Sequence, residues 1–134
     1  GKPIIMSTGI ATYDDIKLAI KTCRDQGNDD ITLLKCTSSY PAPIDEANLV
    51  MIQKFASDFN VKVGLSDHTM GTLVPILSIA MGAKVIEKHF ILNHSVGGPD
   101  ASFSMDEKEF TELVNDIRSA ELAIGMETFE LTKK

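Results

Sequence analysis

Two histidines occupy positions where they could bind a divalent metal ion. His68 follows the apolar run 61–65, and His89 lies near the end of the apolar run 83–91. Neighbouring parallel strands lie about 4.8 Å apart, so imidazoles at adjacent strand ends can converge on one point, and neutral imidazole is a common metal ligand. Two protein ligands would leave coordination positions open for substrate and water, unlike a closed structural zinc site. The alternative is that both are ordinary hydrogen-bonded residues, and His94 is expected to be an exposed bystander.

Glu87 is a carboxylate that shares strand parity with His89, so both side chains should point to the same side of the sheet. A carboxylate inside a barrel needs a partner, because burying an unpaired charge is costly. Metal-bound water is one possible partner, which would place Glu87 beside the metal. Lys35, reaching inward from an earlier strand, is the other, which would make Glu87 structural. The residues alone leave both open.

Other polar side chains follow the remaining predicted strands. Ser7, Ser38 and Ser66 offer three hydroxyls which, with loop N–H groups and helix N-termini, could form a neutral cradle for an anion. Tyr40 precedes a proline in a stiff loop and could contact a sugar or anchor the loop. Asp100 lies in a glycine-rich loop, where it is either a turn residue or a substrate-binding group.

Short apolar runs alternate with longer amphipathic stretches along the chain. We predict strands at 3–7, 31–36, 61–65 and 83–91, and helices from a cap at Thr12 to about 27, at 45–59, at 71–81 (apolar nearly all round and therefore buried), and from Asp106 onward. This alternation predicts an α/β fold with a parallel sheet. Four consecutive βα units would form half of a (β/α)8 TIM barrel. An open doubly wound sheet is disfavoured, because no glycine-rich phosphate-binding motif follows any strand.

Composition narrows the class of protein. The 134 residues carry a net charge of −6, which argues against a nucleic-acid footprint. No apolar run approaches the roughly 18 residues of a membrane span, and no signal peptide opens the chain. Cys23 and Cys36 form no CxxC pair and suggest a reducing, cytoplasmic setting in which both are small core residues. The abrupt ends suggest a segment cut from a longer chain.

Several stretches resemble the sialic acid synthase family, whose members condense phosphoenolpyruvate with an amino sugar to make nonulosonic acids. The resemblance spans nearly the whole chain: KPIIMSTG at 2–9, LLKCTSSYPAP at 33–43, VGLSDHT at 63–69, GAKVIEKHF at 82–90 and GGPDASFS at 97–104. It implies that the chain holds strands five to eight of the barrel. The N-terminal half-barrel and a small antifreeze-like domain would be absent, and the full-length enzyme would be a homodimer.

The resemblance also implies a metal site. His68 and His89 match the ligands of a divalent ion, with Mn²⁺ favoured over Mg²⁺ or Co²⁺. Glu87 matches a glutamate near the metal-bound water. The ion would act as a Lewis acid on the sugar aldehyde.

The same resemblance implies where the substrates bind. Ser7 and Ser66 match serines on the phosphate of phosphoenolpyruvate, and Tyr40 and Asp100 match groups that face the amino sugar. Ser38 stands where sialic acid synthases usually have asparagine, which, with the motifs around it, favours the pseudaminic acid branch.

The expected activity is therefore that of a phosphoenolpyruvate-dependent synthase, with pseudaminic acid as the favoured product and N-acetylneuraminic or legionaminic acid as alternatives. A metal aldolase or isomerase on the same barrel rim is a second possibility, and an inert folding or assembly module is a third. The isolated chain should be inactive, because serine hydroxyls alone supply no positive charge for a phosphate. Its unpaired sheet edges should make it self-associate.

Overall fold

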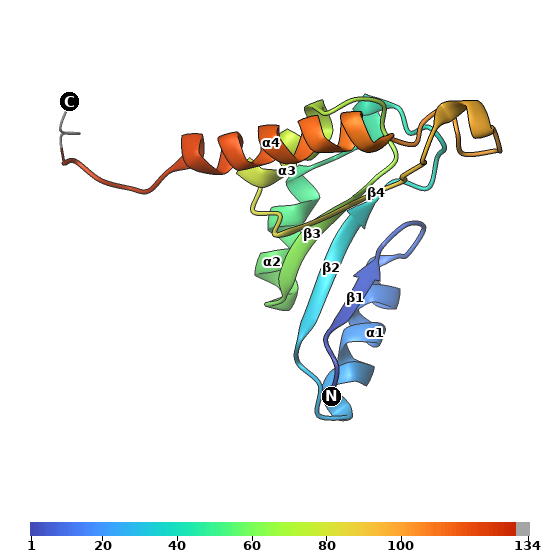
Figure 1. Cartoon of the computed structure of the whole chain (residues 1–134). Helices are drawn as coiled ribbons and strands as arrows, with labels where there is room; N and C mark the ends of the chain where they lie inside the picture. Colours follow the sequence, from blue (N-terminus) through green and yellow to red (C-terminus); the bar gives the residue numbers. More distant parts are fainter. Residues whose placement is uncertain (131–134) are drawn as a thin grey trace.

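The computed structural model describes residues 1–130 and confirms the predicted parallel sheet. The strands lie side by side in chain order, each parallel to the next: β1 (Ile4–Ser7), β2 (Ile31–Cys36), β3 (Lys62–Asp67) and β4 (Val85–Lys88). The sheet is the curled half of a barrel. The loops that follow the strands gather at the end of the sheet away from the N-terminus (Figure 1).

The last two strands differ in length from the prediction. β3 continues to Asp67, two residues past the predicted end, whereas β4 stops at Lys88, three residues before the predicted end. Since β3 ends at Asp67, the residues after Lys88 have no strand neighbour to pair with. They turn to Met105 instead, whose N–H donates to the His89 carbonyl at 2.9 Å and whose carbonyl accepts from the Ile91 N–H at 2.9 Å.

The helices follow the strands as predicted, except that the second predicted helix is divided and the third is only partly buried. They are α1 (Tyr13–Asp25), the 3-10 turn η1 (Ile44–Glu46), α2 (Val50–Phe59), α3 (Leu73–Ala80), the 3-10 turn η2 (His94–Val96) and α4 (Glu107–Ile124). Thr12 and Asp106 cap α1 and α4 as expected. The predicted helix at 45–59 is divided, because Asn48 adopts a positive φ of 43°. No helix within residues 1–130 combines the length and apolar character needed to cross a membrane.

The prediction that α3 is buried all round is wrong. Val74, Pro75 and Ser78 are buried, but Leu73 and Leu77 are 53% and 47% exposed. A helix that packs on one face of a sheet buries only the stripe that it turns toward the sheet.

The hydrophobic core lies between the sheet and the helices. Alternate residues of β2 and β3 point toward the helices, and apolar side chains of α1 and α2 cover them; the core includes Ile16, Ile20, Ile31, Leu33, Ile52, Phe55, Val63 and Leu65.

The opposite, concave face of the sheet carries no helix and is tightly curled. Leu34, Gly64 and Val85 are neighbours across β2, β3 and β4. A Cβ on Gly64 would lie 2.3 Å from the Val85 carbonyl oxygen and 2.6 Å from Leu34 Cδ2, so only glycine fits there. Two residues further on, at the carboxyl ends of the same strands, the concave face becomes polar.

Candidate functional site

The carboxyl ends of β3 and β4 bring the two predicted metal ligands together. His68 and His89 follow the two strands directly, and their ring centroids lie 5.1 Å apart with the rings nearly perpendicular. Asp67 and Lys88, the residues before them, are register partners, so the parallel pairing itself places the histidines side by side. The predicted juxtaposition is confirmed.

His68 is buried, and its surroundings determine which nitrogen carries the proton. Nδ1 lies 2.8 Å from the Thr37 carbonyl oxygen, which can only accept, so Nδ1 donates. In the neutral ring Nε2 therefore keeps its lone pair. Nε2 has no hydrogen-bond partner within residues 1–130, and no fully buried polar side-chain atom there lacks a partner, so Nε2 is not fully buried. A neutral imidazole with one nitrogen anchored to a carbonyl and the other free suits a metal ligand.

His89 has a carboxylate beside it. Nδ1 lies 3.3 Å from Asp100 Oδ2, and the side chains are 32% and 54% exposed. A histidine ligand commonly has such a carboxylate behind it, because the contact fixes the tautomer and raises ligand basicity. The donor set of two imidazoles, each with one nitrogen beside an acceptor, therefore fits a divalent ion.

Aromatic rings enclose the histidine pair. Tyr40 lies in the loop after β2, 54% exposed, with its ring centroid 4.3 Å from that of His68 and 5.9 Å from that of His89. Phe103, buried in the glycine-rich loop, lies 5.1 Å from His89 and 5.8 Å from Tyr40. Phe103 was missed by the sequence analysis, since an isolated aromatic residue in an irregular loop gives no periodic signal.

Glu87 forms a second group with two of the predicted serines. Its Oε1 accepts from Ser66 Oγ at 2.6 Å and from Ser7 Oγ at 3.3 Å. The alternative prediction, that Lys35 is the partner of Glu87, is wrong. Lys35 lies on the helix side of the sheet, and its ammonium donates to the Cys36 carbonyl and to Thr37 Oγ1, both at 3.0 Å. Burial lowers the pKa of Lys35.

Ser38 and Cys36 border this group. Ser38 is exposed and lies beside the loop after β1, where a Cβ on Gly9 would come within 2.9 Å of the Ser38 hydroxyl. Cys36 is buried, as expected, but its thiol lies 4.0 Å from His68 Nδ1. Strand parity could have revealed this, because Cys36 is the register partner of Ser66.

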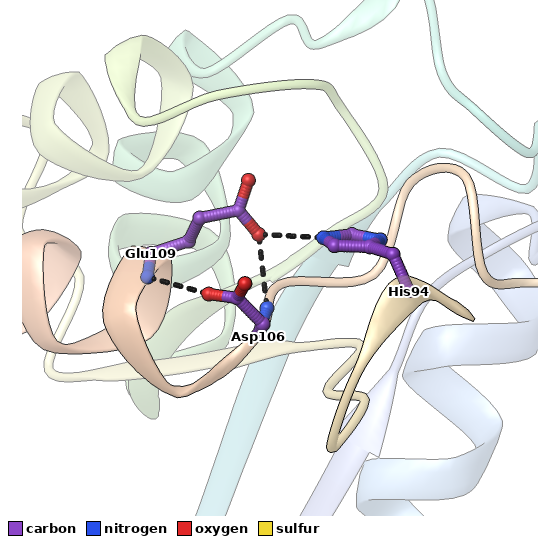
Figure 2. A group of neighbouring side chains, drawn as sticks. All are labelled: His94, Asp106 and Glu109. Atoms are coloured by element: carbon purple, nitrogen blue, oxygen red, sulfur yellow. Dashed lines mark hydrogen bonds and ion pairs between the residues drawn. The ribbon is translucent and has the colours of Figure 1, made fainter. Parts of the chain in front are cut away.

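His94 is not a bystander, although it is exposed. Figure 2 shows its ring directed at Glu109 in the first turn of α4. Its Nε2 lies 3.0 Å from Glu109 Oε2, and its Nδ1 lies 2.9 Å from the Ala101 carbonyl oxygen. Both partners are acceptors, so the ring can donate to both only as an imidazolium. The hydrogen bond to Glu109 is the main cause that raises the pKa of His94.

One oxygen of each carboxylate beside His94 accepts from the backbone at the start of α4. Asp106 Oδ1 accepts from the Glu109 N–H and Glu109 Oε2 accepts from the Asp106 N–H, both at 2.9 Å (Figure 2). This is the capping box of α4. The ligand-type atoms lie within 4.8 Å of one another, but an imidazolium has no lone pair for a cation, so the group is structural.

The chain is similar in sequence to known nonulosonic acid synthases. The chain is 51% identical over 133 residues to a pseudaminic acid synthase of Helicobacter pylori, covering 99% of this chain and 39% of that protein. It is 46% identical to an N,N'-diacetyllegionaminic acid synthase of Legionella pneumophila, covering 92% of this chain and 36% of that protein.

A solved structure shares the fold. The N-acetylneuraminic acid synthetase of Leptospira borgpetersenii matches with a TM-score of 0.89 and 32% identity, over 97% of this chain and 45% of that one. The chain thus spans less than half the length of each of these relatives. The NeuB family model matches residues 1–129, and the chain belongs to the NeuB family.

Proposed function

We propose that this chain forms the metal-binding half of the barrel of a nonulosonic acid synthase, which condenses phosphoenolpyruvate with an amino-sugar aldehyde and releases phosphate. The observation that supports it most is the pair of imidazoles, His68 and His89, side by side at adjacent strand ends. Pseudaminic acid is the favoured product, because the pseudaminic acid synthase of H. pylori is 51% identical. The legionaminic acid synthase, at 46% identity, supports the alternative sugar.

In this proposal His68 and His89 hold a divalent ion, Mn²⁺ in preference to Mg²⁺ or Co²⁺. A divalent ion held there would supply Lewis acidity for the aldehyde of the open-chain sugar. The hydrogen bond from Nδ1 to the Thr37 carbonyl leaves Nε2 of His68 for the ion, and the Asp100 carboxylate lies 3.3 Å from Nδ1 of His89, on the corresponding nitrogen. Tyr40 lies against both imidazoles and would limit how substrate approaches them.

The reaction would form a C–C bond and a C–O bond and break one C–O bond. C3 of phosphoenolpyruvate would attack the aldehyde carbon, and water would add to C2 and give one proton to the former aldehyde oxygen. The bond between C2 and the phosphate oxygen would then break, so that phosphate leaves with the second proton and C2 becomes a ketone. Ser7 and Ser66 would donate to the phosphate oxygens. Since both hydroxyls donate to Glu87 in the structure, phosphate would replace the Glu87 carboxylate as their acceptor. The Glu87 carboxylate would then be free to accept a proton from water beside the histidines.

The sugar would lie on the other side of the histidines. Tyr40 and Asp100 border that side, and Asp100 could accept from sugar hydroxyl or amide groups. The cations that phosphoenolpyruvate needs would come from an N-terminal half-barrel, and an antifreeze-like domain would complete the site in a cytoplasmic homodimer. The chain alone would be inactive.

Phosphate release by the full-length protein tests the proposal. Each candidate amino sugar is supplied with phosphoenolpyruvate and Mn²⁺, and release is followed with and without a chelator. We expect release that depends on the sugar and stops on chelation, fastest with the pseudaminic acid precursor. Turnover of a sugar phosphate without phosphoenolpyruvate would instead indicate an aldolase or isomerase.

A further inference from the structure

A buried ion pair lies directly behind the two histidines. Lys88 Nζ is 2.6 Å from Asp67 Oδ2, and both side chains are only 1% exposed. The other ion pairs described within residues 1–130 are at least partly open to solvent. Taking two charges out of water costs several kcal/mol per ion in general, and nothing in the reaction proposed above uses this pair.

The pair connects the residues on either side of both histidines. Asp67 immediately precedes His68, and Lys88 immediately precedes His89. The second Asp67 oxygen, Oδ1, accepts from the Thr69 N–H at 3.0 Å and from Thr69 Oγ1 at 2.8 Å. Lys88 Nζ also donates to the Thr69 carbonyl at 2.6 Å. The Lys88 ammonium on β4 therefore binds the residue before His68 and the residue after it.

The pair lies on the face of the sheet opposite the site. Asp67 and Lys88 are register partners, and successive strand residues point to opposite faces, so the histidines project to the concave side while the pair projects to the helix side. Both Asp67 oxygens are occupied and the Lys88 ammonium is buried. Neither group is available to substrate, so any influence on the chemistry must pass through the backbone.

We propose that Asp67 and Lys88 are positioning residues that fix the spacing and orientation of His68 and His89. This inference rests on the proposed metal site. A one-residue slip of β4 would place Lys88 opposite a different residue and leave two unpaired buried charges, so the pair specifies one register. The Thr69 contacts then fix the turn at His68, and the ion pair fixes the start of the segment that carries His89.

The test removes both charges together and measures metal binding directly. Asp67→Asn with Lys88→Met keeps an amide oxygen for the Thr69 donors and leaves no unpaired buried charge. In the full-length protein we expect Mn²⁺ to bind about 10–100-fold more weakly by calorimetry, as for other groups that orient metal ligands. The visible spectrum of bound Co²⁺ should also change. The melting temperature shows whether the variant is folded.

A matched control removes an ion pair at the other end of the same sheet. Lys62 Nζ lies 2.7 Å from Asp30 Oδ1 near the amino ends of β2 and β3, where both side chains are exposed. Asp30→Asn with Lys62→Met should leave Mn²⁺ affinity and the Co²⁺ spectrum unchanged. If the Asp67/Lys88 variant does not fold, Thr69→Val decides, since it deletes only the hydroxyl that donates to Asp67 and should weaken Mn²⁺ binding measurably.

The outcomes separate this inference from the proposed function. Unchanged Mn²⁺ affinity and Co²⁺ spectrum in the folded double variant, or in Thr69→Val where the double variant does not fold, overturn the positioning role and leave the metal site intact. A wild-type protein that binds neither Mn²⁺ nor Co²⁺ overturns the metal site and the positioning role together.

Discussion

The strand ends and the start of α4 both bring histidine and carboxylate side chains together, yet their chemistry differs. At the strand ends His68 and His89 each have one nitrogen beside an acceptor: the Thr37 carbonyl for His68 and the Asp100 carboxylate for His89. At the start of α4 both nitrogens of His94 face acceptors, Ala101 O and Glu109 Oε2. The first arrangement keeps a lone pair available, and the second uses both nitrogens as donors.

If metal sites were predicted from the closeness of ligand-type atoms alone, the group at the start of α4 would be chosen in place of the strand-end histidines. The ligand-type atoms of His94, Asp106 and Glu109 lie within 4.8 Å of one another, which resembles a metal site. Hydrogen bonds explain why these side chains gather: the two carboxylates cap the helix, and His94 holds the loop to it through Glu109 (Figure 2). What distinguishes a metal ligand is therefore an unused lone pair.

The largest expected effect tests this contrast. In the full-length protein His68→Ala or His89→Ala deletes one of only two proposed protein ligands, so the loss of Mn²⁺ affinity should exceed the about 10–100-fold typical of groups around the ligands. His94→Gln should leave Mn²⁺ affinity unchanged. Calorimetry and chelator-sensitive phosphate release measure both. Near-normal binding by both alanine variants would show that the metal lies elsewhere.

A smaller pair of effects would sharpen the contrast within the strand-end site. Ser66→Ala should raise the KM for phosphoenolpyruvate, because a lost hydrogen bond to phosphate costs about 0.5–3 kcal/mol. Asp100→Asn keeps the shape but removes the charge, and should raise the KM for the sugar or lower turnover. Varying each substrate in turn separates them.

Asp100 needs an additional control because it lies 3.3 Å from His89. The Mn²⁺ affinity of Asp100→Asn shows whether its effect passes through the histidine. Equal effects of both variants on both substrates would contradict the division into a phosphate side and a sugar side.

Most of the fold was predictable from the sequence. Apolar runs alternating with amphipathic stretches predicted the parallel sheet and the order of its elements, and the caps at Thr12 and Asp106 were recognised by residue type. The errors concern element boundaries that depend on backbone angles and strand pairing, which the sequence pattern does not show. Asn48 breaks a helical pattern through one backbone angle, and β4 ends early because β3 offers it no further partner.

The candidate site was predictable only in part, for a similar reason. Strand parity correctly placed Glu87 on the same side of the sheet as His89. It could not show that the hydrogen-bond partner of Glu87 is Ser66 and not Lys35. That choice depends on which face of the sheet Lys35 occupies. The buried Asp67–Lys88 pair was missed because the sequence does not show that these two residues are neighbours. Only the register of β3 against β4 pairs them.

The smallest expected effect concerns the pH dependence of the His94 contact. Its hydrogen bond to Glu109, and next the Ala101 carbonyl, raise the pKa of His94 above the ordinary value of 6.5, so its stabilising contribution is complete below that pH and is lost as pH rises through the raised pKa. The pKa of Glu109 is lowered below 4.5, first by the Asp106 N–H and then by His94, so its contribution is lost only as pH falls through the lowered value. Both contributions are therefore present between about pH 4.5 and 6.5.

Thermal denaturation of the wild type and of His94→Gln across pH 5 to 9 measures this dependence. The difference in Tm should be greatest near pH 5 to 6 and decline toward pH 9, and it should stay small because the side chain is exposed and its ion pair is screened. Mn²⁺ affinity, measured in parallel at one pH, should be the same in both proteins. A Tm difference that did not vary with pH would mean that His94 acts by packing alone, and the contrast with the strand-end histidines would then rest on metal affinity without support from protonation.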